Sequence, residues 1–184
     1  MAALRGKSAG AAGKGKIMTD EDFMELALEQ ARAALDAGEF PVGCVIAGDC
    51  GVLAAGARRG SAGEAPSELD HAEILALKAL EEKAGAAGRS RLSLYVTMEP
   101  CLMCFGAIIL NRIPRIVYAY EDVMGGAAGC RLPDLPELYA GSGVRIAGGV
   151  LRQKSLELFK AHFSDPRQGY WQNSLLARYT LSQE

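Results

Sequence analysis

Apolar residues recur along this 184-residue chain with two periods, which predict alternating helices and strands. Thr19-Asp20-Glu21-Asp22 is typical of a helix start, and an apolar stripe follows it at Phe23, Leu26, Ala27, Ala31 and Ala34. Gly38 is the expected end of this helix. Two further apolar runs, 41–47 and 52–57, flank a turn at 48–51 and predict a β-hairpin.

The rest of the chain continues the alternation. We expect a helix from His71, a strand at 93–97, a helix from Cys101 to about Asn111, strands at 115–120 and 144–146, and a last long helix at 150–162. Residues 58–69 and the glycine-rich stretch 125–129 are expected loops. A hairpin followed by βα units predicts a three-layer α/β/α fold, with helices on both faces of a mixed five-stranded sheet.

The two ends of the chain differ in composition from this body. Residues 1–18 are expected to form a flexible basic tail, an expression remnant or a targeting segment, because the first sixteen contain four basic residues, no acid and no apolar signal-peptide stretch. Residues 19–163 fit one domain of ordinary size. Residues 164–184 are expected to be a C-terminal extension packed on that domain.

Composition sets limits on the class of protein. The chain is 49% hydrophobic, and it contains no apolar run near the ~20 residues that a membrane span needs, so no membrane partner is expected. Its net charge is −2, and without the four basic residues of the tail the remainder carries −6. With no secretory segment, a reducing compartment, the cytoplasm, is expected, and with it free thiols rather than disulfides.

Two short motifs carry the candidate chemistry: His71-Ala72-Glu73 and Pro100-Cys101-Leu102-Met103-Cys104. Cys101 and Cys104 are three residues apart, which places both sulfurs on one face of a helix that Pro100 favours starting there. His71 and Glu73 can converge beyond a second helix N-terminus. The set offers three ligands for one Zn²⁺ and a carboxylate, Glu73, that need not bind metal. A catalytic zinc site keeps its fourth position for water, whereas a structural site fills it with a side chain.

Each motif also has an ordinary interpretation when taken alone. A Cys-x-x-Cys pair could be redox-active or structural, and a single histidine at a helix start is more often a satisfied polar residue. The other cysteines compete poorly, because Cys44 lies in an apolar strand, Cys50 in a turn and Cys130 in a loop. The combination of both motifs favours a catalytic zinc.

The two motifs together resemble the signature of the zinc-dependent cytidine deaminase-like superfamily. The resemblance implies hydrolytic removal of an amine from a nucleobase, with Glu73 carrying protons between water, ring nitrogen and leaving ammonia. Within this superfamily the chain is most similar to the tRNA-specific adenosine deaminases, which convert wobble adenosine to inosine. The matching stretches are 38–43, 71–74, 94–104, 106–108 and 126–129.

The closer resemblance also implies substrate contacts and a partner. Phe40, Pro41 and Val42 would line the base pocket, and the backbone around Ala72 and Glu99 would contact the base edge. The family is usually homodimeric, and the helix after Cys101 is a plausible interface through its apolar residues Phe105, Ile108 and Ile109. The same three residues could equally belong to the core.

Two of the departures from these relatives bear most on the substrate. Arg58 stands where the family has an asparagine that holds the ribose, and it could pair with a phosphate or carboxylate of a different substrate or lie solvated on its loop. In the C-terminal extension, Tyr170 and Trp171 could stack on a base or close the pocket, or they could anchor the extension to the body.

Charge bears on the substrate as well, because a polyanion binder normally presents a basic face. An acidic body argues against tRNA, although a local patch from Arg112, Arg115, Arg131 and Arg152, or the basic tail, could supply one. Three hypotheses follow: a tRNA adenosine deaminase, a deaminase of a free base, nucleoside or nucleotide (of the guanine, cytosine, cytidine or deoxycytidylate type), or an inactive zinc-stabilised partner subunit. The intact Glu73 argues against the third.

Overall fold

A computed structural model of the chain describes residues 18–63, 65–83 and 89–184. The predicted basic tail at 1–18 lies, apart from Met18, outside the described residues. The helices are α1 (Asp20–Asp36), α2 (Ala72–Lys83), α3 (Leu102–Leu110), α4 (Glu137–Ala140), α5 (Arg152–Ser164) and α6 (Leu175–Ser182). The strands are β1 (Gly43–Gly48), β2 (Gly51–Ala57), β3 (Ser93–Met98), β4 (Arg115–Tyr120) and β5 (Arg145–Ala147), and short 3₁₀ turns lie at Arg89–Arg91 and Leu132–Asp134.

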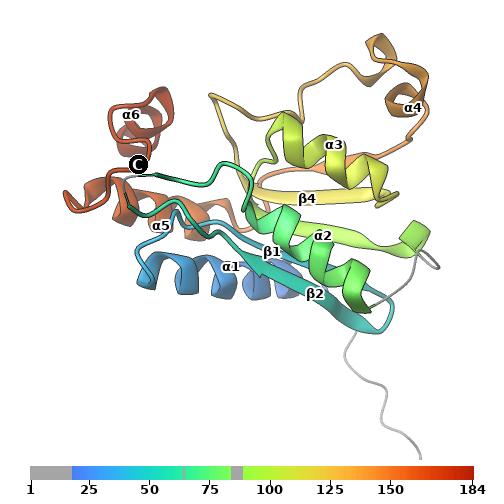
Figure 1. Cartoon of the computed structure of the whole chain (residues 1–184), viewed down its shortest axis with the longest axis horizontal. Coiled ribbons are helices and arrows are strands. Elements are labelled where there is room, and N and C mark those ends of the chain that lie inside the picture. The colour runs from blue at the N-terminus through green and yellow to red at the C-terminus, as the bar shows by residue number, and fades with distance from the viewer. Residues whose placement is uncertain (1–17, 64, 84–88) are drawn as a thin grey trace, which may run out of the picture.

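The five strands form one mixed sheet in the order β2-β1-β3-β4-β5 (Figure 1). β1 is antiparallel to both β2 and β3, as expected of a hairpin strand, with Cys44 opposite Val96. β4 is parallel to β3 and to β5, with helices in the connections. The parallel pairing of β4 with β3 and with β5 follows from the βα pattern that the sequence predicted.

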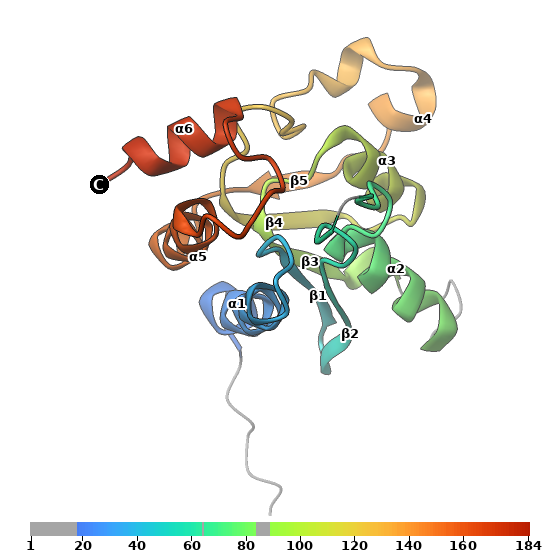
Figure 2. The same ribbon diagram turned by 60° about the vertical axis from the view of Figure 1, so that its left-hand side comes forward.

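Helices cover both faces of the sheet. Figure 2 shows α1 and α5 on one side and α2 and α3 on the other. The strand residues alternate accordingly, because successive side chains of a strand point to opposite faces. Buried apolar residues form two clusters. One contains residues of α1 together with Val45, Tyr95 and Val117, and the other contains residues of α2 and α3 together with Ile46, Leu94 and Ile116. The predicted three-layer α/β/α fold with a mixed five-stranded sheet is confirmed.

Local signals explain where these elements begin. Thr19 and Asp22 form a reciprocal capping box at the start of α1, in which the Asp22 N–H donates to Thr19 Oγ1 at 3.2 Å and the Thr19 N–H to Asp22 Oδ2 at 2.8 Å. β1 begins at Gly43 rather than at the expected Pro41, because proline has no N–H for a ladder bond. The sequence pattern did not predict α4 and α6.

Gly56 in β2 brings the start of α2 close to the sheet. A Cβ at this position would lie 2.3 Å from the Ala72 carbonyl oxygen, a separation that no side chain tolerates. The absence of a side chain therefore sets the distance between β2 and the first turn of α2, and with it the position of His71. In the described part of the chain, no helix has the length and apolar character needed to cross a membrane.

Candidate metal centre and pocket

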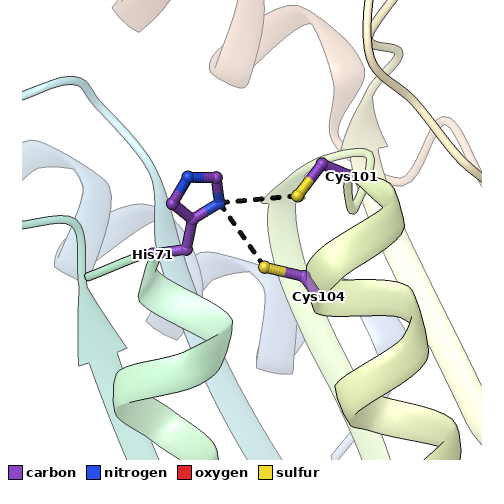
Figure 3. Close-up of side chains that lie close together, drawn as sticks. All are labelled: His71, Cys101 and Cys104. Carbon is purple, nitrogen blue, oxygen red and sulfur yellow. Dashed lines mark hydrogen bonds between the residues drawn. The ribbon is translucent and has the colours of Figure 1, made fainter. Parts of the chain in front are cut away.

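The two sequence motifs meet at two neighbouring helix N-termini. His71 directly precedes α2, and its carbonyl accepts the first helical hydrogen bond from Leu75 N–H at 3.0 Å. Cys101 is the N-cap residue of α3, and Cys104 lies one turn further on. Figure 3 shows the imidazole of His71 facing both sulfurs from the end of the neighbouring helix. The predicted convergence of the two motifs is therefore present in the structure.

The three ligand atoms suit a tetrahedral zinc ion. His71 Nδ1 lies 3.7 Å from Cys101 Sγ and 3.4 Å from Cys104 Sγ, and the three atoms all lie within 4.8 Å of one another. With Zn–S near 2.3 Å and Zn–N near 2.0–2.1 Å, ligands on a tetrahedral zinc are about 3.5 Å apart. The spacing of the donor atoms and the His/Cys/Cys donor set therefore fit zinc.

The thiol chemistry of the pair points the same way. The hydrogen bond from Cys104 and the interaction with His71, opposed by burial, lower the pKa of the Cys101 thiol to about 4. The pKa of Cys104 is raised instead, because its thiol donates to Cys101 and is buried. The two thiols are therefore shifted in opposite directions. A divalent cation is the group that stabilises both as thiolates.

Glu73 lies beside this set as a buried carboxyl group. Its residue is 3% exposed, and burial raises its pKa above the ordinary value of 4.5. It is not part of the three-ligand group. A carboxyl group with a raised pKa next to a metal site can both accept and return a proton near neutral pH.

A pocket of about 290 Å³ opens over these residues, at the lower end of the ~300–1,000 Å³ typical of small-molecule sites. Five of the six residues predicted to contact substrate line it: Phe40, Val42, Arg58, Ala72 and Glu99. Pro41 is buried next to them but is not part of the lining. Six further lining residues were not singled out by the sequence, although Met98 and Met103 lie in the matched stretch 94–104: Glu68, Met98, Met103, Asp122, Gly125 and Leu176.

The side chain of Glu99 holds a loop. Its two oxygens accept hydrogen bonds from the backbone N–H groups of Asp122, at 3.1 Å, and Ala128, at 2.9 Å. Ala127 N–H in the same loop donates to the Pro100 carbonyl at 2.9 Å, and Gly126 pairs with Cys101. The Glu99 N–H donates to the Tyr120 carbonyl at 2.7 Å, so the side chain and the amide of Glu99 both hold neighbouring backbone in place.

Arg58 lies almost fully buried at the pocket, 3% exposed, and is not solvated on its loop. Its guanidinium donates to the Arg59 carbonyl at 3.0 Å and to Tyr170 Oη at 3.3 Å, and it lies 3.9 Å from the Glu68 carboxylate. Tyr170 and Trp171 also line the pocket. The C-terminal extension therefore returns to the site, although Arg58 and Tyr170 are 112 positions apart in the sequence.

The remaining candidates fall elsewhere. Cys44 is a fully buried core residue, Cys50 is exposed, and all five cysteines are free thiols. The apolar residues Phe105, Ile108 and Ile109 of α3 are buried in the core, which leaves them unavailable as an interface. Three of the four arginines considered as a basic patch are paired with acids: Arg115 with Asp20, Arg131 with Asp134, and Arg152 with Glu121.

Comparisons with known proteins agree with this site. A family model described as the cytidine and deoxycytidylate deaminase zinc-binding region matches residues 17–120. The chain is 34% identical over 152 residues to the tRNA-specific adenosine deaminase of Bacillus subtilis, which covers 81% of this chain and 91% of that protein.

Solved structures give the same picture. One concerns A-to-I editing by tRNA:A34 deaminases at the wobble position of transfer RNA, and it superposes with a TM-score of 0.62 at 34% identity over 74% of this chain and 97% of the other. A guanine deaminase from Nitrosomonas europaea also superposes with a TM-score of 0.62, at 28% identity over 77% of this chain and 83% of the other.

Proposed function

The chain belongs to the cytidine and deoxycytidylate deaminase zinc-binding family, and we propose that it converts adenosine at the wobble position of tRNA to inosine. It is a zinc-dependent hydrolase that acts on the C–N bond of an amidine. The observation that carries the proposal is the convergence of three zinc ligands and a buried, non-ligand carboxyl group at the floor of a pocket of base size.

In this site His71, Cys101 and Cys104 would hold the zinc ion. When bound, zinc acts as a Lewis acid that lowers the pKa of a water molecule to about 7. Glu73 accepts the proton that this water loses. It returns this proton to the ring nitrogen as the water oxygen bonds to the ring carbon. It then takes the second proton from that oxygen and passes it to the amine, so that ammonia departs as the carbonyl forms. The raised pKa of Glu73 suits both directions of transfer.

The pocket residues would hold the base above this floor. Phe40 and Val42 supply apolar walls, and the backbone at Ala72 and the carbonyl of Glu99, whose N–H is bonded to Tyr120, would contact the base edge. Glu99 fixes that edge indirectly, because its carboxylate anchors the loop at 122–128. Base recognition would thus depend on backbone groups that two helix starts and one anchored loop hold in place.

A second candidate, deamination of a free base or nucleoside, is supported by the charges of the described residues. The pairing of three candidate patch arginines with acids weakens the case for a basic surface, and the Arg58 guanidinium at the pocket is bonded to Tyr170 at 3.3 Å. The similarity to a guanine deaminase agrees with this alternative. We rank this candidate second, because the chain is similar to the tRNA-specific enzyme over most of the length of both proteins.

A substrate panel separates the two functions. Zinc-loaded protein is given an anticodon stem-loop with a wobble adenosine and, separately, adenine, guanine, cytosine, cytidine and deoxycytidylate, and products are identified by mass spectrometry and ammonia release. We expect inosine in the stem-loop, and a matched stem-loop with guanosine at the wobble position serves as control. Turnover of a free base or nucleotide alone would overturn the tRNA proposal.

We further propose a homodimer located in the cytoplasm. The outer side of α3 presents exposed apolar residues, with Leu102 67% and Leu110 58% exposed, in place of the buried residues that the sequence suggested. The free thiols at the zinc site suit a reducing compartment. Light scattering of the native chain and of a Leu102→Glu variant tests the assembly. A monomeric native chain would refute the dimer.

A further inference from the structure

The C-terminal segment, residues 165–184, supplies one wall of the pocket. Its helix α6 packs on α5, with Leu176 and Ala177 buried (Figure 1). Thr180 and Tyr120 share a hydrogen bond at 3.1 Å, and Tyr179 Oη donates to Glu121 at 2.6 Å. These contacts fix the segment to the sheet end near the zinc site, so Tyr170, Trp171 and Leu176 line the pocket.

Tyr170 is held at both its ends. Its hydroxyl accepts from Arg58 at 3.3 Å and donates to Glu68 at 2.8 Å, and so bridges a cation and a carboxylate that are themselves 3.9 Å apart. Its carbonyl accepts from Nε2–H of the buried His162 at 3.2 Å. Its ring packs edge-on against Phe40, with centroids 5.2 Å apart. A side chain fixed in this way is suited to position its neighbour.

That neighbour, Trp171, adopts an unusual backbone conformation. Its φ is +59°, in the left-handed region that bulky residues rarely occupy. Such strain persists only where surrounding contacts impose it, and it concentrates at binding sites. The result is a large aromatic ring that remains 39% exposed and lines the pocket, 5.7 Å from the Tyr170 ring. Trp171 does not belong to either apolar cluster of the described residues.

We propose that Trp171 is a base-recognition residue, whose indole stacks on a nucleobase at the pocket mouth, and that Tyr170, held by Arg58 and Glu68, is the residue that positions it. The proposal rests on the deaminase function proposed above and deepens it. Stacking on an aromatic side chain suits any base, because every base has a π-face. The C-terminal segment would thus form part of the substrate site and not only an anchor.

Trp171 is the only tryptophan of the chain, which gives a readout that does not depend on activity. The zinc-loaded Glu73→Gln variant is titrated with the anticodon stem-loop and, separately, with guanine, while tryptophan fluorescence is followed. We expect saturable quenching by the ligand that the enzyme deaminates. Adding Tyr170→Phe, which keeps the ring and removes the hydroxyl bridge, should reduce the quenching at saturation.

Activity measurements complete the test. Trp171→Ala should weaken substrate binding by roughly 5- to 150-fold, about 1–3 kcal/mol, through KM rather than kcat, and Trp171→Phe should restore most of it. Leu181→Ala is the matched control, because Leu181 is 50% exposed on α6 and does not line the pocket. Circular dichroism checks that each variant folds.

The outcomes separate the two proposals. Quenching by guanine alone, with turnover of guanine alone, would support the role of Trp171 and overturn the tRNA assignment. Turnover of the stem-loop without quenching, and with an unchanged KM in Trp171→Ala, would overturn the role of Trp171 and leave the assignment intact.

Discussion

Gly126 offers a direct test of how the zinc site is supported, because its neighbours leave no room for a side chain. A Cβ at this position would lie 2.4 Å from Cδ and 2.5 Å from Oε1 of Glu99, and 2.6 Å from the Asp122 carbonyl oxygen. In Gly126→Ala either the Glu99 carboxylate or the loop must move. Both movements disturb the hydrogen bonds to Glu99 and the pairing of Gly126 with Cys101.

The expected cost is that of overpacking, about 1–3 kcal/mol. For a chain of this size each kcal/mol corresponds to about 2–4 °C in melting temperature. Thermal unfolding of the zinc-loaded protein should therefore shift downward by several degrees. Because the displaced segment pairs with a zinc ligand, zinc retention on dialysis, measured by elemental mass spectrometry, should fall as well.

Gly129→Ala is the matched control in the same loop. No atom lies within 4 Å of its added Cβ, so its stability should stay within about 0.5 kcal/mol of the native chain. If Gly126→Ala melted and retained zinc like Gly129→Ala, the argument that Glu99 and this loop together support Cys101 would be refuted.

Three further predictions concern other parts of the molecule. Gly106 lies in α3 with open space where a Cβ would be, so Gly106→Ala should raise the free energy of unfolding by about 0.5–1 kcal/mol, measured by urea denaturation. A lower free energy of unfolding would show that the helix is more crowded than the structure indicates. Burial lowers the pKa of His162 below its ordinary value of 6.5, so its contribution to stability is complete above that pH and declines as the pH falls below it. The free energy of unfolding, measured at about pH 7.5 and about pH 5.5, should therefore differ less between the two pH values in His162→Gln than in the native chain. An equal difference in both proteins would contradict this. Arg58→Asn should change the ratio of kcat/KM between stem-loop and free bases, whereas unchanged constants on every substrate would leave Arg58 without a role in specificity.

The metal site could be predicted because each of its two motifs is a local pattern at a helix start. Two helix starts fix the directions of His71, Cys101 and Cys104, and Pro100 marks one of them in the sequence. The sheet followed from hydrophobic period and from the order of hairpin and βα units. Such patterns specify which face of an element is buried, and here that was enough to place both motifs at one end of the sheet.

The pocket wall that the C-terminal segment supplies could not be predicted, because its contacts join distant parts of the chain. Nothing in the spacing of Tyr170 indicates that it meets Arg58 and Glu68. One local signal was available: Ser174 caps α6 by accepting from Ala177 N–H at 3.0 Å, and apolar residues follow at helical spacing. That signal predicts a helix, but its docking place depends on Tyr120 and Glu121, far earlier in the chain.

The central claim is that Glu73 carries protons beside a zinc ion that it does not bind. The Glu73→Gln variant tests it most directly, because the amide keeps the size of the side chain and loses its proton chemistry. Zinc content by elemental mass spectrometry and inosine formation in the stem-loop are measured on the same preparation. The account predicts full zinc occupancy and a turnover reduced by roughly 10²–10⁴-fold. Near-native turnover with bound zinc, or loss of the zinc itself, would contradict it.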